Sequence, residues 1–265
     1  MQSTGRAGRR PRWRIAAARA AAIVVSTTAA LAASAVPAQA AASATLSAAF
    51  HPERLGAPTS VSFAFTITDP AGSVPAPLSA VSIRYPAGLG LATSGLGVAS
   101  CTAATIERFG PDACPTDSRM GSGSALLRFT IGGAVFSERA RLALLAGPSP
   151  DGYLHLLIAA TGTQPVAARV VMATLLDEGA LQITVPAVPS LPEGPDVAIV
   201  TVQATLGGKL TYYEHDRGHT LAYHPRGPAL PLRCPRGGFG FAASFTLADD
   251  SHTSARTTVS CPHPR

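Results

Sequence analysis

Short runs in which apolar and small polar residues alternate constrain the fold of this chain more than any other feature. In residues 61–67 the alternation puts Phe63, Phe65 and Ile67 on one face, which is the pattern of a half-buried β-strand. The same period recurs at residues 81–85, 125–131, 140–145, 153–159, 181–185, 197–206, 210–213, 239–247 and 253–259. Turns rich in Gly and Pro separate the runs, so we expect an all-β, antiparallel sandwich, with an immunoglobulin-like arrangement as one form of it.

Two segments need a separate interpretation. Residues 166–176 fit a buried strand or a short helix, and the flanking Pro165 and Gly179 favour the strand. Residues 186–195 hold prolines at every third position, which excludes pairing inside a sheet and predicts an extended crossover. A boundary near residues 147–152 would divide residues 41–147 from 148–265. These two regions form either two small β domains or one large domain.

The four cysteines predict two structural disulfides. Four cysteines allow three connectivities, and we favour the local pairs Cys101–Cys114 and Cys234–Cys261, because each pair brackets a loop or hairpin. In the chain-entropy model, loops of this size stabilise the fold by about 3 to 3.6 kcal/mol each. The close C-x2-C spacing of zinc sites and redox pairs is missing from the sequence.

The first 40 residues have the composition of a cleaved signal peptide. Six arginines and no acidic residue precede an apolar stretch at about residues 20–36, and Ala38-Gln39-Ala40 supplies the small residues of a cleavage site. The apolar stretch is short and alanine-rich for a bilayer span, which needs roughly 20 strongly apolar residues. An uncleaved membrane anchor is the alternative. Pro11-Arg12-Trp13 departs from the hydrophobic pair of a twin-arginine signal, which favours ordinary secretion.

Removal of this leader changes the charge of the protein. The chain has 21 basic and 15 acidic residues, a net charge of +6. The six leader arginines account for the whole excess, so the mature chain is expected to be neutral and to keep no stable membrane span. The high overall pI is therefore no argument for binding to nucleic acid or to an anionic membrane.

The cysteine segments carry a resemblance. The element from Cys101 to Cys114-Pro115, followed by Ser118-Arg119-Met120-Gly121, and the segment from Cys234-Pro235 to Cys261 are similar to uncharacterised secreted actinobacterial proteins. Those proteins have a Cys…Cys-Pro element and a C-terminal disulfide-closed hairpin. The resemblance implies a fold and an exported location, and it transfers no functional residue and no activity.

Histidines form the most conspicuous polar cluster. His215 and His219 have the i, i+4 spacing of a zinc helix, and Glu214 and Asp216 are adjacent. The surrounding residues 212–223 are better interpreted as a hairpin that turns at residues 216–218. There, Glu214 or His215 would face His219 or the residue after it across the turn. Two ligands near a hairpin tip do not complete a metal site, so these histidines are weak metal candidates beside a solvated turn.

Other catalytic and cofactor motifs give no assignment. The segment Gly121-Ser122-Gly123 is a near miss to the serine-hydrolase elbow, and it precedes a strand rather than a helix. Asp249-Asp250-Ser251 could contribute to a surface calcium site, but the full ligand series is missing. Phosphate-loop and dinucleotide motifs are absent from the sequence, so we expect no cofactor.

The sequence thus predicts a secreted or cell-envelope, non-enzymatic β-sandwich with a binding, adhesion or structural role. It would act on an extracellular or envelope partner and not on nucleic acid. A secreted hydrolase with a dispersed active site is one alternative. The other is an envelope lipid carrier or pore, for which the low charge and the alternating strands argue.

Overall fold

The computed structural model describes residues 41–97, 99–150, 153–162, 169–177, 179–190 and 194–261, all within the compact unit Gln39–Arg265. The predicted signal peptide lies outside the described residues. The strands are β1 (Ser43–His51), β2 (Ser60–Thr68), β3 (Leu78–Arg84), β4 (Leu89–Leu91), β5 (Arg119–Ile131), β6 (Ala134–Ala146), β7 (Leu154–Thr161), β8 (Arg169–Asp177), β9 (Ala180–Thr184), β10 (Ala198–Leu206), β11 (Tyr212–Asp216), β12 (His219–Tyr223), β13 (Ala229–Pro231), β14 (Phe239–Leu247) and β15 (His252–Val259). The helix is α1 (Ala103–Phe109), and short 3₁₀ turns lie at Thr93–Gly95, Pro111–Ala113 and Thr116–Ser118.

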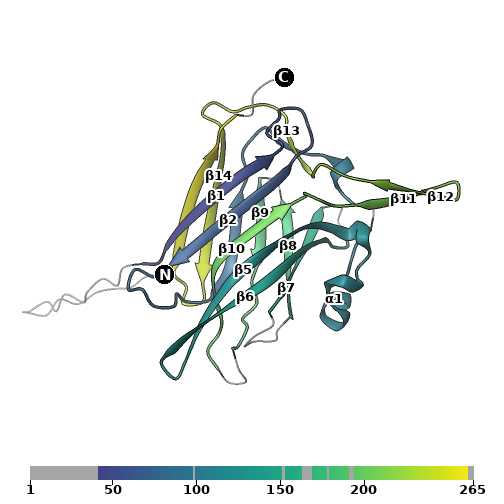
Figure 1. Cartoon of the computed structure of the whole chain (residues 1–265). Coiled ribbons are helices and arrows are strands. Elements are labelled where there is room, and N and C mark those ends of the chain that lie inside the picture. Colours follow the sequence, from purple (N-terminus) through teal and green to yellow (C-terminus); the bar gives the residue numbers. More distant parts are fainter. Residues whose placement is uncertain are drawn as a thin grey trace, which may run out of the picture. The chain divides into compact units, whose positions relative to one another are not determined.

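Within the described ranges, eleven strands form one antiparallel sheet in the order β1-β2-β10-β5-β6-β7-β8-β9-β3-β14-β15 (Figure 1). Strands from both sides of residues 147–152 alternate along this order, because β10 pairs with β2 on one side and with β5 on the other. The predicted all-β antiparallel fold is confirmed. An immunoglobulin domain divides its strands between two sheets, whereas these eleven strands belong to one continuous sheet.

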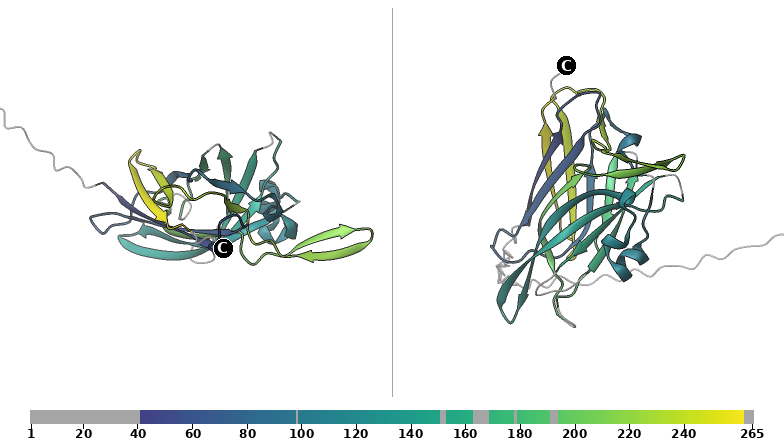
Figure 2. Two further views of the ribbon diagram at one scale, coloured as in Figure 1. Left: turned by 90° about the horizontal axis from the view of Figure 1, so that it is seen from above. Right: turned by 45° about the vertical axis from the view of Figure 1, so that its right-hand side comes forward.

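The sheet curls so that its two ends face each other in a sandwich-like layout (Figure 2). Edge strand β1 lies against edge strand β15. Aromatic side chains join the two layers, since the rings of Phe65 on β2 and Phe245 on β14 are 4.8 Å apart. The Phe63–Phe241 rings are 5.3 Å apart in an edge-to-face contact. Such pairs add about 0.5–1.5 kcal/mol beyond their buried area, so they stabilise the closed layout.

The predicted faces and several strands are confirmed. Phe65 and Ile67 are buried in one core cluster, and Phe63 packs against it. Strand β8 covers most of residues 166–176, for which the sequence favoured a strand over a helix, and residues 163–168 lie outside the described residues. Strand β1 was missed because its Ala- and Ser-rich sequence has a weak apolar alternation.

Helix α1 was also missed, and it explains a long apolar run in β6. Thr102 caps the helix by accepting a hydrogen bond from the Thr105 backbone N–H. Ile106 is buried in a cluster with Leu145, on the outer face of the sheet. Leu144, the neighbour of Leu145, faces the interior cluster. Consecutive residues of β6 are therefore buried on opposite faces, which hides the period of two.

Both disulfides have the predicted connectivity. Cys101 bonds Cys114 across the loop that contains α1, with a Cα–Cα distance of 5.5 Å. Cys234 bonds Cys261 with a Cα–Cα distance of 5.8 Å, and this bond closes the β14–β15 hairpin at its open end. The two bonds brace the outer helix and the edge of the sheet.

The two ends of the sandwich are covered differently. At one end, β4 pairs with β13 as a separate two-stranded sheet. At the other end, the proline-rich crossover connects β9 to β10, as predicted, and closes on itself through a bridge between Pro189 and Asp196. The described part of the chain contains no helix that is long and apolar enough to cross a membrane.

Candidate binding cavity

Three adjoining cavities lie between the two layers of the sandwich. The mouth cavity is at the end that β4 and β13 cover, and its volume is about 160 Å³. The central cavity is about 130 Å³ and the distal cavity, under the proline-rich crossover, about 50 Å³. The mouth and central cavities share the lining residues Phe63, Ile83, Leu156, Leu181 and Leu206. The central and distal cavities share Leu127, Ala160, Met172, Val185 and Ile199.

The space arises because several short side chains meet in the middle of the sandwich. Strand β14 fills its side with the buried rings of Phe241 and Phe245. Strands β5, β7 and β10 present Ala125, Ala160 and Ala204 to the central cavity. Alanine is too short to reach across the gap between the layers, so the alternation that builds the strands leaves the middle of the sandwich incompletely filled.

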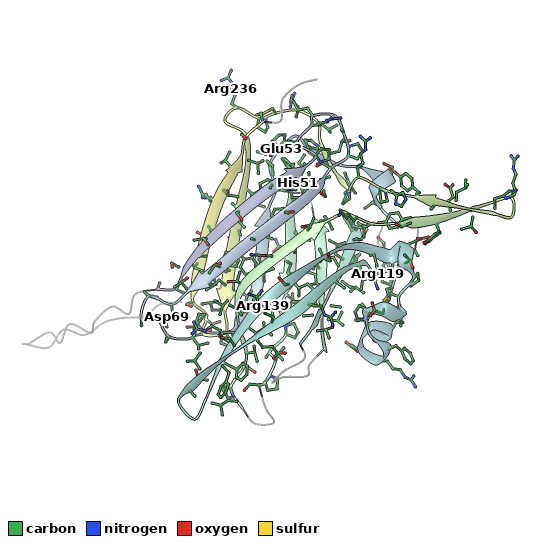
Figure 3. All side chains as sticks on the ribbon, in the orientation of Figure 1. His51, Glu53, Asp69, Arg119, Arg139 and Arg236 are labelled. Atoms are coloured by element: carbon green, nitrogen blue, oxygen red, sulfur yellow. A yellow bond between two sulfur atoms is a disulfide. The ribbon has the colours of Figure 1, made fainter. Side chains whose placement is uncertain are left out.

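The lining is wholly apolar in the central cavity and almost wholly apolar in the other two. The buried polar side chains of the described residues are Thr59, Ser60, Ser118, Glu138, Thr174 and Ser190, and none of these lines a cavity. The charged side chains of Glu53, Arg139 and Arg236, labelled in Figure 3, are exposed, and those of Asp69 and Arg119 are half-buried outside the cavities. An apolar void of this kind excludes water and accepts apolar ligands.

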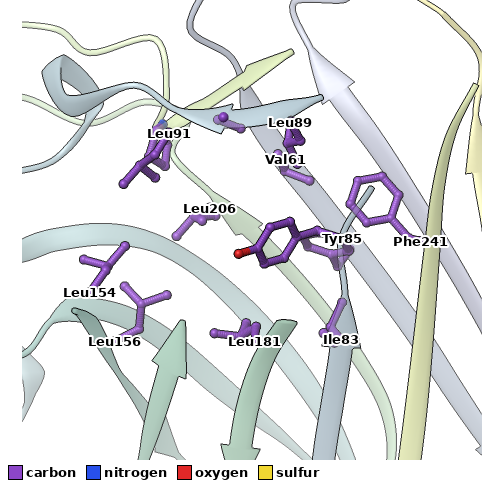
Figure 4. Close-up of a pocket in the computed structure, with 14 residues that line it drawn as sticks. Val61, Ile83, Tyr85, Leu89, Leu91, Leu154, Leu156, Leu181, Leu206 and Phe241 are labelled. Atoms are coloured by element: carbon purple, nitrogen blue, oxygen red, sulfur yellow. The ribbon is translucent and has the colours of Figure 1, made fainter. Parts of the chain in front are cut away.

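One hydroxyl reaches the mouth cavity. The ring of Tyr85 points into this cavity, beside Leu181 and Leu206 (Figure 4). Its hydroxyl accepts a hydrogen bond of 2.9 Å from the backbone N–H of Gly179. Leu91 lines the same cavity yet is 43% exposed, so the cavity opens to solvent beside it. A ligand that enters here can keep a polar group near Tyr85 and the opening.

The size of the cavities sets the size of a ligand. An apolar cavity of about 150 Å³ holds one benzene molecule. On that scale the three cavities hold roughly 13 carbon atoms. Along β10 the lining runs from Leu206 to Ile199, about 23 Å at a strand rise of about 3.3 Å per residue. A zigzag hydrocarbon advances about 1.25 Å per carbon, so volume rather than length limits the ligand.

The histidine pair of the sequence lies on the hairpin β11–β12. The residues form the predicted hairpin, with His215 opposite Thr220 and His219 opposite Asp216. The turn contains Arg217 and Gly218 at φ values of 47° and 85°, which a tight two-residue turn requires. No group of three His, Cys, Asp or Glu able to hold a metal occurs in the described residues. The side chain of His215 is not among the described residues.

The serine near miss is part of the sheet. Gly121 and Gly123 lie in β5 and pair with Leu206 and Ala204 of β10. A Cβ on Gly121 would stand 2.1 Å from the carbonyl oxygen of Thr205, so glycine is required for the close approach of the two strands. The motif is explained by strand packing, with Ser122 exposed on the outer face.

The acidic turn at Asp249 is held by local hydrogen bonds. The Ser251 hydroxyl and backbone N–H donate to the carboxylate of Asp249 at 2.6 and 3.0 Å. These two bonds lower the pKa of Asp249, the hydroxyl most strongly. The Ser73 hydroxyl and the Ala71 N–H similarly lower the pKa of Asp69. Both carboxylates thus accept hydrogen bonds from residues of their own turns.

The cavity is the feature that sequence reasoning could not locate. The alternation indicated which residues face inward, and together with the low charge it was the signal for a lipid carrier. Alanines at inward positions of β5, β7 and β10 could have indicated an unfilled core, had the strand order been known. Comparisons with protein-family models, with curated proteins and with solved structures found no match to this chain.

Proposed function

We propose that this protein is an exported, non-enzymatic binding protein that holds a single acyl chain, or a similar hydrocarbon, inside its sandwich. The observation that carries the proposal is the row of adjoining cavities with an almost wholly apolar lining and an opening beside Leu91. An adhesion or purely structural role needs no such interior space. Among the roles that the sequence left open, lipid carriage uses it.

Export is the second part of the proposal. Residues 1–40 have the charge, the apolar stretch and the small residues of a signal peptide. The two disulfides support an oxidising compartment, where such bonds persist. Most lipids are sparingly soluble in the aqueous space outside a cell, so a neutral carrier with a dry interior would have a use there.

The proposed ligand has a hydrocarbon tail of about 12 to 14 carbons and one polar end. The tail would run from the mouth cavity into the central and distal cavities, with the polar end near the Tyr85 hydroxyl. Each buried methylene contributes about 0.8 kcal/mol, so affinity should rise about fourfold per carbon until the cavities are full. Beyond that length the gain should stop.

Calorimetric titration of the purified protein with fatty acids of increasing chain length tests the proposal. We expect one dodecanoate per chain, a steep gain from short to medium chains and a plateau near 12 to 14 carbons. Native mass spectrometry should find the bound acid chemically unchanged, as a non-enzymatic carrier requires. Absence of binding at every chain length, with the fold intact by circular dichroism, would refute the proposal.

A further inference from the structure

The hairpin β11–β12 begins and ends at the opening of the mouth cavity. The residue at the end of β10, Leu206, lines that cavity, and so does Pro228 after the hairpin returns. Figure 1 shows β11 and β12 extending away from the curled sheet as a separate two-stranded sheet. Every residue of β12 is exposed. The hairpin is therefore a projection whose base is at the opening.

The base of this projection is fixed to the body. The Tyr212 side chain is buried, and its hydroxyl donates a 2.7 Å hydrogen bond to the carbonyl oxygen of Arg119. The Tyr213 backbone N–H donates to the Asp117 carboxylate at 3.0 Å. These bonds hold the hairpin in place at its base, so its exposed side chains keep a defined relation to the opening.

Large apolar side chains are exposed on and beside the projection. Leu221 on β12 is 56% exposed, and the aromatic ring of Tyr223 is also exposed. Leu232 is 60% exposed, and it lies beside Gly90, a lining residue of the mouth cavity. Leu232 and Leu91 thus place apolar surface beside the opening, and Leu221 and Tyr223 place apolar surface on the projection. Exposed apolar groups gathered at one site mark a surface that meets another apolar phase.

The segment that follows β12 carries a local positive charge, while exposed acids on neighbouring segments are Glu214 on β11 and Glu53 after β1. Residues 223–238 contain Arg226, Arg233 and Arg236 and no acidic residue. All three arginines are exposed. This segment includes β13, which covers the mouth end, so the cations share that end of the molecule with Leu232. Together they are complementary to a surface that is negatively charged outside and apolar just beneath.

We propose that Leu221, Tyr223, Arg226, Leu232 and Arg233 form a mouth surface that docks reversibly on an anionic lipid bilayer. The arginines would contact the headgroups, and the leucines and the tyrosine ring would enter the interface, where amphipathic rings are favoured. Docking would place the opening at the source of the acyl chain. The inference rests on the proposed function, since it gives that cavity its supply of ligand.

Co-sedimentation of the full chain with vesicles tests the mouth surface. Phosphatidylcholine vesicles that contain phosphatidylglycerol are compared with vesicles of phosphatidylcholine alone. We expect binding to the anionic vesicles, weakened by added salt. The double variant Arg226→Gln/Arg233→Gln should bind about 25-fold more weakly, about fivefold for each arginine. Leu221→Ser/Leu232→Ser should lose about tenfold for each leucine.

Two control variants separate a specific surface from general charge and apolarity. Arg139→Gln/Arg141→Gln removes two exposed arginines of β6, and Phe109→Ser removes an exposed ring of α1. Both should bind vesicles like the unchanged protein. Dodecanoate affinity and the melting temperature should be unaltered in the mouth-surface variants, because these side chains are exposed and line no cavity.

The two proposals fail differently. If the unchanged protein binds dodecanoate but neither vesicle type, the docking inference is wrong and the mouth surface serves a protein partner or none. If control and mouth-surface variants lose vesicle binding equally, the assigned surface is wrong. Vesicle binding without dodecanoate binding would leave the docking surface standing and overturn the proposed function.

Discussion

Ala160→Phe offers the sharpest test of an open interior. Ala160 lies on β7, paired with Leu142 of β6, and its side chain lines both the central and the distal cavity. The substitution adds a phenyl ring of six carbons. The central cavity is about 130 Å³, and a benzene molecule needs a cavity of about 150 Å³. The ring should therefore fill most of the central cavity and close the passage beyond it.

The expected magnitudes follow from these volumes. The mouth cavity alone has room for roughly six carbons, so the affinity plateau should move from about 12 to 14 carbons to about six. Dodecanoate loses burial of about six methylenes, near 5 kcal/mol, and should bind over a thousandfold more weakly. At about 24 cal/mol per Å³, filling the void could stabilise the ligand-free protein by up to about 3 kcal/mol.

Two measurements decide the outcome. Calorimetry with the fatty acid series gives the plateau, and urea unfolding gives the free energy of unfolding. Ala64→Phe places the same ring on the outer face of β2 and should change neither quantity greatly. If Ala160→Phe costs about 1–3 kcal/mol, as overpacking of a filled core does, and leaves dodecanoate affinity unchanged, the interior is closed and the reasoning from the cavities is wrong.

Three further outcomes test the fold. Phe245→Ala removes a fully buried ring from the contact with Phe65, and the free energy of urea unfolding should fall by about 3–5 kcal/mol. Cys101→Ser/Cys114→Ser opens a loop with a sequence separation of 13. The free energy of unfolding should fall by about 3 kcal/mol. A reducing agent should then lower the unfolding free energy of this variant only by the amount expected for the Cys234–Cys261 bond. Burial, followed by the charge of Asp117, raises the pKa of Tyr212 from its ordinary value of 10.0 to about 12. Because the folded state keeps the proton more tightly, its stabilisation is present below pH 10 and is lost as pH rises toward 12. Tyr212→Phe should flatten the dependence of the unfolding free energy on pH in this window, and an unchanged slope would contradict the assignment.

The local sequence pattern predicted the structure correctly where residues close in sequence decide it. The strand at residues 61–67 was predicted because its inward and outward residues differ clearly in polarity, and the structure buries Phe65 and Ile67. The hairpin at residues 212–223 was predicted from its turn chemistry, and the chain turns at Arg217-Gly218. The disulfide pairing followed from loop length. In each case the decisive neighbours are close in sequence.

The structural features that the sequence did not predict depend on contacts between distant segments. Helix α1 has a single fully buried residue, Ile106, and its short length leaves no visible period. The β11–β12 hairpin was expected from the sequence. Its separation from the main sheet has no local signature in the sequence. Leu221 and Leu232 are exposed while Leu230 and Leu247 are not, and composition alone does not distinguish them.

The sequence by itself determined that this chain forms many antiparallel strands with two local disulfides, because alternation, turn residues and loop closure act over a few residues. Only the tertiary structure decided that eleven strands join in one sheet that curls over an apolar space. That outcome depends on which strands become neighbours. It brings Ala125, Ala160 and Ala204 together from three separate strands around the central cavity, and their short side chains leave it unfilled.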